Sequence, residues 1–180
     1  TIDNLKQQRS SDYYQIIHLA THADFKEGAI SNSYIAMWQS KLTLDKIPEM
    51  GWNDPQVDLL IISACRSALG NREAELGLAG LAIKSGVKSA IASLWSVSDE
   101  GTFTLMSEFY RQIRESPIKA EALRQAQLEM IRGEARIENG RLFRPNGDSI
   151  ELPPQLAGIS KPNLQHPYYW SAFTTIGSPW

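Results

Sequence analysis

Three short apolar runs, separated by polar and helix-forming segments, constrain the fold of this chain more than any other feature. They cover residues 13–20, 57–64 and 87–95. Strands of a parallel sheet are buried on both faces and are therefore apolar almost throughout. Because helical patterns follow the second and third runs, the sequence predicts an α/β fold with a mainly parallel sheet and helices on its faces.

Two chemically active side chains come directly after the first and second runs. His22 lies just past the first run, and Cys65, the only cysteine of the chain, follows the second. Open α/β sheets place reaction sites just past the carboxyl ends of their strands, and right-handed crossovers bring those ends to the same edge. We therefore expect His22 and Cys65 to lie close together. A cysteine thiolate formed beside a histidine is a working nucleophile.

Composition limits the classes of partner. The chain has 180 residues, 42% of them hydrophobic, which is enough for one domain with a core. A net charge of −2 with scattered Lys and Arg argues against nucleic acid and against a membrane surface as partners. Residues 1–11 are polar, unlike a signal peptide. A lone cysteine forms no internal disulfide and fits a reducing, cytoplasmic location.

Periodicity and turn residues predict the remaining elements. Leu5 and the polar residues around it are predicted to be the tail of a helix. Further helical patterns cover 42–46, 76–85, 99–115 and 117–132. Short strands are predicted at 33–38, 135–137, 141–143 and 168–176. Polar residues predict loops at 23–33, at 66–75 and over much of 133–167.

Local signals set several of these boundaries. Ser98 is expected to cap the helix that follows it, with Asp99 in the first turn, where negative charge suits the helix dipole. Pro117 is expected at the first position of the next helix. Gly86 is a typical residue after a helix, and Asn139-Gly140 is typical of a two-residue hairpin turn.

His18 and His22, which are four residues apart, are candidate metal ligands. That spacing has no special metal geometry on a strand, and no carboxylate or cysteine cluster completes a ligand set. We therefore expect no metal and no other cofactor, and we interpret His18 as a buried strand residue with a hydrogen-bonded ring. Taken alone, Cys65 is best interpreted as a small buried hydrophobe, which a free cysteine often is. The polar loop after it favours a thiol at the sheet edge.

Five segments occur in a distinctive order along the chain. They are HLATH at 18–22, SACRSA at 63–68, ELGLAGL at 75–81, SLWSVSD at 93–99 and HPYYWSAF at 166–173. In this order they resemble the CHAT domain family, which comprises caspase- and separase-like cysteine peptidases of clan CD. The resemblance implies one three-layer α-β-α caspase-like domain over residues 1–180. The family's first strand has no counterpart here, which suggests a piece of a longer protein.

The resemblance also implies roles for individual residues. Cys65 would be the nucleophile and His22 the general acid and base of a peptidase. The backbone N–H groups of Cys65 and Ala23 would bind the oxyanion. Relatives usually carry glycine after the catalytic histidine. Ala23 keeps the N–H group, but its Cβ would make a positive φ costly at this position.

Specificity is expected to depend on Asp99. In separase-like relatives an aspartate after the Leu-Trp strand end faces a basic P1 side chain, and a carboxylate pairs well with Arg or Lys. The alternative that Asp99 is only an ordinary acid in the first turn of a helix has equal weight. Trp95 would line the same pocket or serve as a core aromatic. Glu73 and Glu75 are interpreted as solvated loop acids, with a lesser chance of touching substrate.

The sequence therefore predicts a cysteine endopeptidase that cleaves after Arg or Lys. The resemblance implies a protein or peptide substrate, control by attached tetratricopeptide-repeat or other domains, and a bacterial source. Two alternatives stay open. One is a catalytically silent scaffold for interaction or regulation, to which Ala23 would point, and the other is a cysteine-dependent acyltransferase or amidase on a similar sheet.

Overall fold

The computed structural model describes residues 1–24, 26, 30–63, 77–158 and 163–180. The chain forms two compact units. The first unit comprises Thr1–Ser96 and Phe173–Ser178, and the second comprises Val97–Ala172 and Pro179–Trp180. Among the described residues, each helix is too short or too polar to cross a bilayer.

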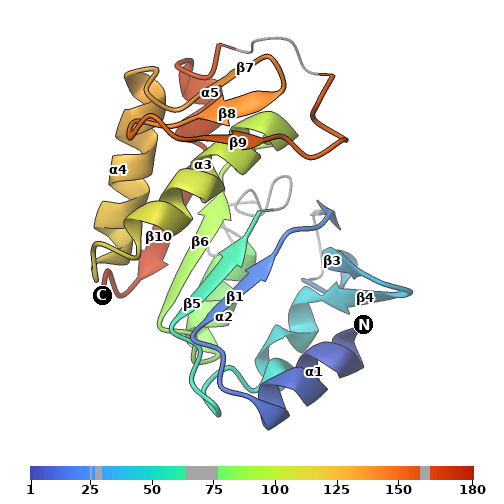
Figure 1. The fold of residues 1–180 in the computed structure, drawn as a ribbon. Coiled ribbons are helices and arrows are strands. Elements are labelled where there is room, and N and C mark those ends of the chain that lie inside the picture. Colours follow the sequence, from blue (N-terminus) through green and yellow to red (C-terminus); the bar gives the residue numbers. More distant parts are fainter. Residues whose placement is uncertain (25, 27–29, 64–76, 159–162) are drawn as a thin grey trace. The chain divides into compact units, whose positions relative to one another are not determined.

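A four-stranded sheet forms the centre of the first unit (Figure 1). In spatial order its strands are β1 (Ile16–Leu19), β5 (Leu59–Ile62), β6 (Ser89–Ser93) and β10 (Phe173–Gly177). The first three strands are parallel to one another, and β10 is antiparallel to β6. The expected α/β class with a mainly parallel sheet is confirmed.

The apolar runs form strands because their side chains are buried. Every residue of β5 and β6 is buried, as expected for central strands of a parallel sheet. The strands are shorter than the runs that predicted them. Residues such as Val57 and Val87 are buried in the core without lying in a strand, so an apolar run extends past its hydrogen-bonded ladder.

A helix packs on this sheet within the first unit. Helix α1 (Ile2–Ser11) precedes β1, and α2 (Gly77–Lys84) packs on β5, β6 and β10. Gly86 follows α2 with a φ of 108°, which agrees with the expected helix end. Predicted loop 66–75 lies outside the described residues.

A second, three-stranded antiparallel sheet follows β1. Its strands are β2 (Ala23–Asp24), β3 (Tyr34–Met37) and β4 (Ser40–Thr43), with the 3-10 helix η1 (Ile30–Asn32) before β3. The predicted strand at 33–38 is confirmed as half of a hairpin. The predicted helix at 42–46 is wrong in its first part. Leu42 is fully buried opposite Ile35 in the β3–β4 ladder, and helical turns of 3-10 type, η2 (Leu44–Met50), begin only afterwards.

The second unit contains two long helices and a small sheet. They are α3 (Asp99–Gln112), α4 (Lys119–Ile131), β7 (Arg136–Glu138), β8 (Arg141–Phe143) and β9 (Ser149–Glu151). The Ser98 cap is confirmed, since its Oγ accepts a hydrogen bond from the N–H of Gly101 at 3.1 Å. The hairpin turn is confirmed as well, with positive φ at both Asn139 and Gly140. Strand β9 falls in a region expected to be loop.

Two predicted boundaries in this unit are wrong. Helix α4 begins at Lys119 with Ile118 as its cap, so Pro117 is not its first residue. The strand expected at 168–176 begins only at Phe173, because Pro167–Trp170 forms the short helix α5. The His166 side chain accepts a hydrogen bond from the N–H of Tyr168, and Pro167 suits the first turn, so local capping overrides the β-propensity of the aromatic residues.

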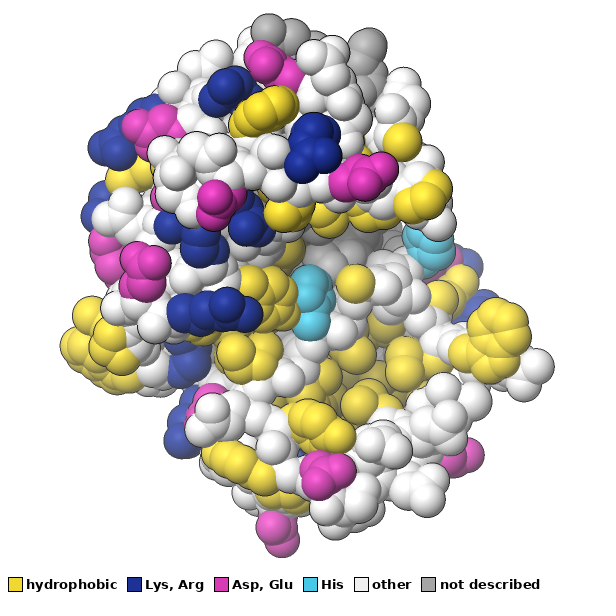
Figure 2. Space-filling view, in the orientation of Figure 1, with side chains coloured by type: hydrophobic (Ala, Val, Ile, Leu, Met, Phe, Trp, Pro, Cys, Tyr) yellow, Lys and Arg dark blue, Asp and Glu magenta, His cyan; other side chains and the backbone are white. Residues whose placement is uncertain are grey.

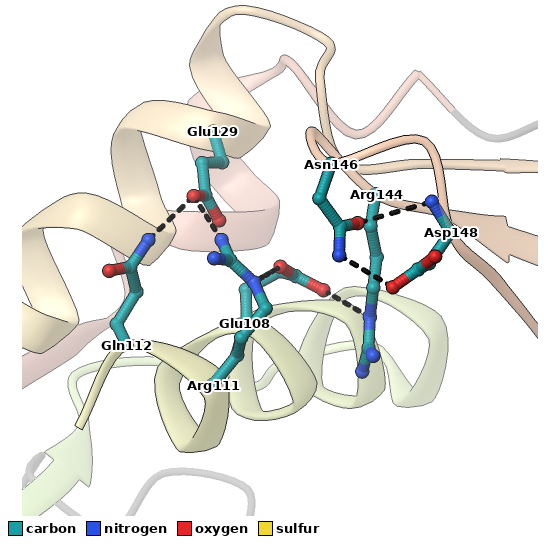
Figure 3. Close-up of polar contacts among 7 residues, drawn as sticks. All are labelled: Glu108, Arg111, Gln112, Glu129, Arg144, Asn146 and Asp148. Carbon is teal, nitrogen blue, oxygen red and sulfur yellow. Dashed lines mark hydrogen bonds and ion pairs between the residues drawn. The ribbon is translucent and has the colours of Figure 1, made fainter. Parts of the chain in front are cut away.

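A buried network of charges joins the elements of the second unit (Figure 3). The Glu108 carboxylate on α3 is fully buried and accepts hydrogen bonds from Arg111 Nε at 2.8 Å and Arg144 Nε at 2.9 Å. Arg111 also donates to Glu129 on α4, as does Gln112 at 2.6 Å. Burial alone lowers the pKa of Arg111, but its hydrogen bonds to Glu129 and Glu108 raise that pKa overall. The network links α3, α4 and the segment after β8.

Charged side chains of both signs are mixed on the visible face of the second unit. Figure 2 shows Lys and Arg interspersed with Asp and Glu over α3, α4 and the strands β7–β9. Neither sign forms a continuous patch on that face. This distribution agrees with the small net charge of −2.

Candidate active site at the carboxyl edge of the sheet

The carboxyl ends of the three parallel strands are aligned. Leu19 of β1 pairs with Ile62 of β5, and Ile62 pairs with Ala92 of β6, so these three residues form one row across the sheet. His22 follows Leu19 by three positions in the sequence, and Trp95 follows Ala92 by three positions. Two of the predicted site residues therefore follow this row of the sheet at the same distance along the chain.

Cys65 has the same offset in the sequence, three positions past Ile62. It lies outside the described residues, as do Glu73 and Glu75. Its proximity to His22 stays a prediction. The register nevertheless meets the condition on which that prediction depends, because the strands that lead to the two residues are adjacent, parallel and in step.

The backbone around His22 is tied to β3. The carbonyl oxygen of His22 accepts a hydrogen bond from the N–H of Ala36 at 2.8 Å, and the hydroxyl of Thr21 donates to the carbonyl of Ala36 at 2.9 Å. The His22 side chain is exposed. This arrangement fixes the main chain of a histidine while leaving its ring accessible to a substrate, which suits a general acid and base.

The backbone N–H of Ala23 is not used by the ladder between β2 and β3. It pairs with Ile35, next to the hydrogen-bonded pair of His22 and Ala36. Antiparallel ladders alternate between hydrogen-bonded and non-hydrogen-bonded pairs, so the N–H of Ala23 points away from β3. Among the described residues other than glycine, only Gln39 and Asn139 have a positive φ. Ala23 is therefore unstrained, and the glycine of relatives is not needed for this conformation.

His18 lies within β1, one residue before the last residue of that strand. Its Nε2 is 2.8 Å from Oγ of Ser63, the first residue past β5. Burial lowers the pKa of His18, which favours the neutral ring near pH 7. The expected hydrogen-bonded ring is confirmed. The partner was not predicted, although a serine at the end of an apolar run is the signal that points to it. No group of three potential metal ligands occurs among the residues that the structure describes.

The burial of His18 predicts a pH dependence of stability. Its pKa is lower in the folded chain than in the unfolded one, where it has its ordinary value near 6.5. Around and below that pH the unfolded chain binds more protons, so the free energy of unfolding falls as the pH falls. We expect His18→Gln, which stays neutral, to be less sensitive between pH 7 and 5. Urea unfolding of both proteins at each pH checks this, and parallel pH profiles would contradict it.

Trp95 and Asp99 follow β6. Trp95 is partly exposed, so it is not a fully buried core aromatic. Asp99 is the first residue of α3 and is exposed. Its carboxylate lies where it stabilises the helix dipole. That role accounts for an acid at this position, so recognition of a basic side chain by Asp99 stays a prediction.

Comparison with known proteins identifies a family for the chain. A family model described as CHAT domain matches residues 1–178. No curated protein matches the chain. The matched range includes residues of both units and all five segments singled out in the sequence.

Proposed function

The chain belongs to the CHAT domain family, and we propose from this premise that it is a cysteine endopeptidase with a dyad of His22 and Cys65. The family is related to caspase-like cysteine peptidases. The observation that carries the proposal is the register of β1 and β5. Because Leu19 and Ile62 are paired, His22 and Cys65 follow adjacent parallel strands at equal distances along the chain.

The proposed reaction uses these residues in sequence. The Cys65 thiolate attacks the carbonyl carbon of the scissile bond, and the negative charge develops on the carbonyl oxygen. The outward N–H of Ala23, with the N–H of Cys65, stabilises that charge. His22 gives a proton to the departing amine and then takes a proton from the water that hydrolyses the thioester.

Chain connectivity supports this assignment. Cys65 follows Ser63 by two positions, and two residues of extended chain span at most about 7 Å. Ser63 in turn is held against His18 of β1. The nucleophile is therefore proposed to act at the edge of the sheet where β1 ends, which is the edge on which the exposed His22 lies.

We also propose that Asp99 gives a preference for Arg or Lys at P1. Asp99→Ala is expected to lower kcat/KM for such substrates by about tenfold or more, because a charge-assisted pair with the substrate is lost. Glu100→Ala is the matched control, since Glu100 is also an acid of the first turn of α3. Equal P1 profiles for Asp99→Ala and the parent chain would refute this role.

A panel of fluorogenic peptides tests the proposed function. Substrates with Arg, Lys, Asp or Leu at P1 are given to the parent chain and to Cys65→Ala. Cleavage after Arg or Lys that depends on Cys65 supports a basic-specific peptidase. Cleavage of amides without any internal peptide-bond cut would favour an amidase or acyltransferase.

The alternative of a silent scaffold depended on alanine in place of glycine after His22. Ala23 has an extended backbone that any L-residue adopts. Ala23 therefore gives little support to the scaffold alternative, and the peptidase proposal is preferred. Attached regulatory domains remain part of the proposal through the family resemblance, and a cytoplasmic location remains part of it through the lone cysteine.

A further inference from the structure

A side-chain hydrogen bond links β1 and β5 at the point where their ladder ends. His18 pairs with Ile61, and Leu19 pairs with Ile62, the last residue of β5. Ser63 comes next and lies in no strand. Its Oγ is 2.8 Å from Nε2 of His18.

The bond continues the connection between the strands past their last backbone pair. Residues i and i+2 of an extended chain face the same side, so Ser63 lies on the same face of the sheet as Ile61. His18 is the residue of β1 that pairs with Ile61, so it lies on that face as well. The side chain of His18 therefore reaches diagonally toward the start of the segment after β5. Both partners are partly buried, and a broken bond there would leave polar groups poorly solvated.

A neutral imidazole is suited to a hydrogen bond with a serine hydroxyl. It offers one donor and one acceptor nitrogen, and a serine hydroxyl can match either one. Burial lowers the pKa of His18 and so favours the neutral form. The bond is therefore made by uncharged partners at neutral pH.

We propose that His18 and Ser63 are a positioning pair that orients the segment leading to Cys65 and thereby sets the reactivity of its thiol. The inference rests on the proposed function for the assignment of Cys65 as nucleophile. Ser63 precedes Cys65 by two residues, so rotation at Ser63 displaces everything that follows. Misplacement of a reacting group by about 1 Å can cost about 100-fold in rate.

Alkylation of Cys65 by iodoacetamide provides a direct test. Cys65 is the only cysteine, so mass addition to the intact chain reports one thiol. Displacing the thiol from the groups that stabilise its thiolate would return its pKa to about 8.5 and lower the alkylation rate at pH 7 about tenfold. We expect this decrease in Ser63→Ala and in His18→Leu. The double variant should be no slower than either single variant, because the two side chains act as one unit.

Two further variants separate positioning from general damage to the fold. His18→Gln retains a neutral hydrogen-bonding group and is expected to restore the rate to within about threefold. Ser89→Ala removes another serine bond, from Oγ of Ser89 to the carbonyl of Asp58, at the opposite end of the same sheet. It should alkylate like the parent chain. Circular dichroism checks that each protein is folded. If His18→Leu does not fold, the alkylation rate of Ser63→Ala alone tests the positioning pair.

The outcomes for the pair and for the dyad are distinct. An unchanged alkylation rate in folded Ser63→Ala overturns the positioning pair, whatever His22→Ala does. A slower rate in Ser63→Ala supports the pair even when His22→Ala has no effect, a result that counts against the peptidase dyad alone. Labelling of Ser63 by a fluorophosphonate would overturn the inference as well, since Ser63 would then be a nucleophile itself.

Discussion

Cys65→Ala is expected to abolish peptide cleavage while the chain stays folded. Removing the nucleophile leaves only binding and oxyanion stabilisation, so kcat should fall by about 1,000-fold or more. The substitution deletes a single sulfur atom and adds no bulk, so the thermal midpoint should change little. Product formation from the Arg and Lys substrates, measured with the two proteins at equal concentration, checks this result.

The histidines provide the matched control for this prediction. His22→Ala should reduce cleavage as severely as Cys65→Ala, because the two groups act as a unit. His166→Asn changes another exposed histidine and retains a side chain able to cap α5. It should cleave at nearly the parent rate. If Cys65→Ala turned over substrate as fast as the parent chain, the assignment of His22 and Cys65 as a catalytic dyad would be refuted.

Glu108→Gln is expected to destabilise the second unit more than other single substitutions of its charged residues. The Glu108 carboxylate is fully buried between Arg111 and Arg144. Removing its charge takes from Arg144 the carboxylate with which it pairs and leaves Arg111 paired with Glu129. Breaking a buried ion pair costs about 3–5 kcal/mol. Urea unfolding at pH 7, followed by circular dichroism, measures the loss.

An exposed pair of the same chemistry serves as the control. Glu121 lies on α4, and the hydrogen bond from Arg124, followed by that from Gln125, lowers its pKa to about 2. This pair is solvated, so Glu121→Gln should change the unfolding midpoint far less. Equal destabilisation by the two substitutions would mean that burial of Glu108 is not what makes its network important.

The order of strands and helices was predictable because it depends on local patterns. The apolar runs around Ile17, Leu60 and Ile91 predicted the parallel strands, and Ser98 predicted the start of α3. Helix α5 was missed, although His166 and Pro167 are typical residues for a helix start. The aromatic residues that follow favour a strand by propensity alone, so two local signals competed and the capping geometry prevailed.

The site was predictable only in part, because it depends on register. The sequence places His22 and Cys65 after two strands, but it does not say which residues pair. The alignment of Leu19 with Ile62, and the bond from His18 to Ser63, both join residues more than 40 positions apart in the sequence. Such contacts follow from tertiary packing. The extended backbone of Ala23 likewise results from its pairing with β3 rather than from local preference.

Covalent labelling of the chain by a peptidyl-arginine chloromethylketone tests the central claim most directly. The probe places a basic P1 side chain and an electrophilic carbon where the scissile bond would lie, so it requires binding, nucleophile and histidine together. We predict one adduct per chain, located on Cys65, that is absent in His22→Ala and much slower with an aspartyl probe. A parent chain that shows no adduct, or an adduct that forms equally fast in His22→Ala, would contradict a His22–Cys65 peptidase.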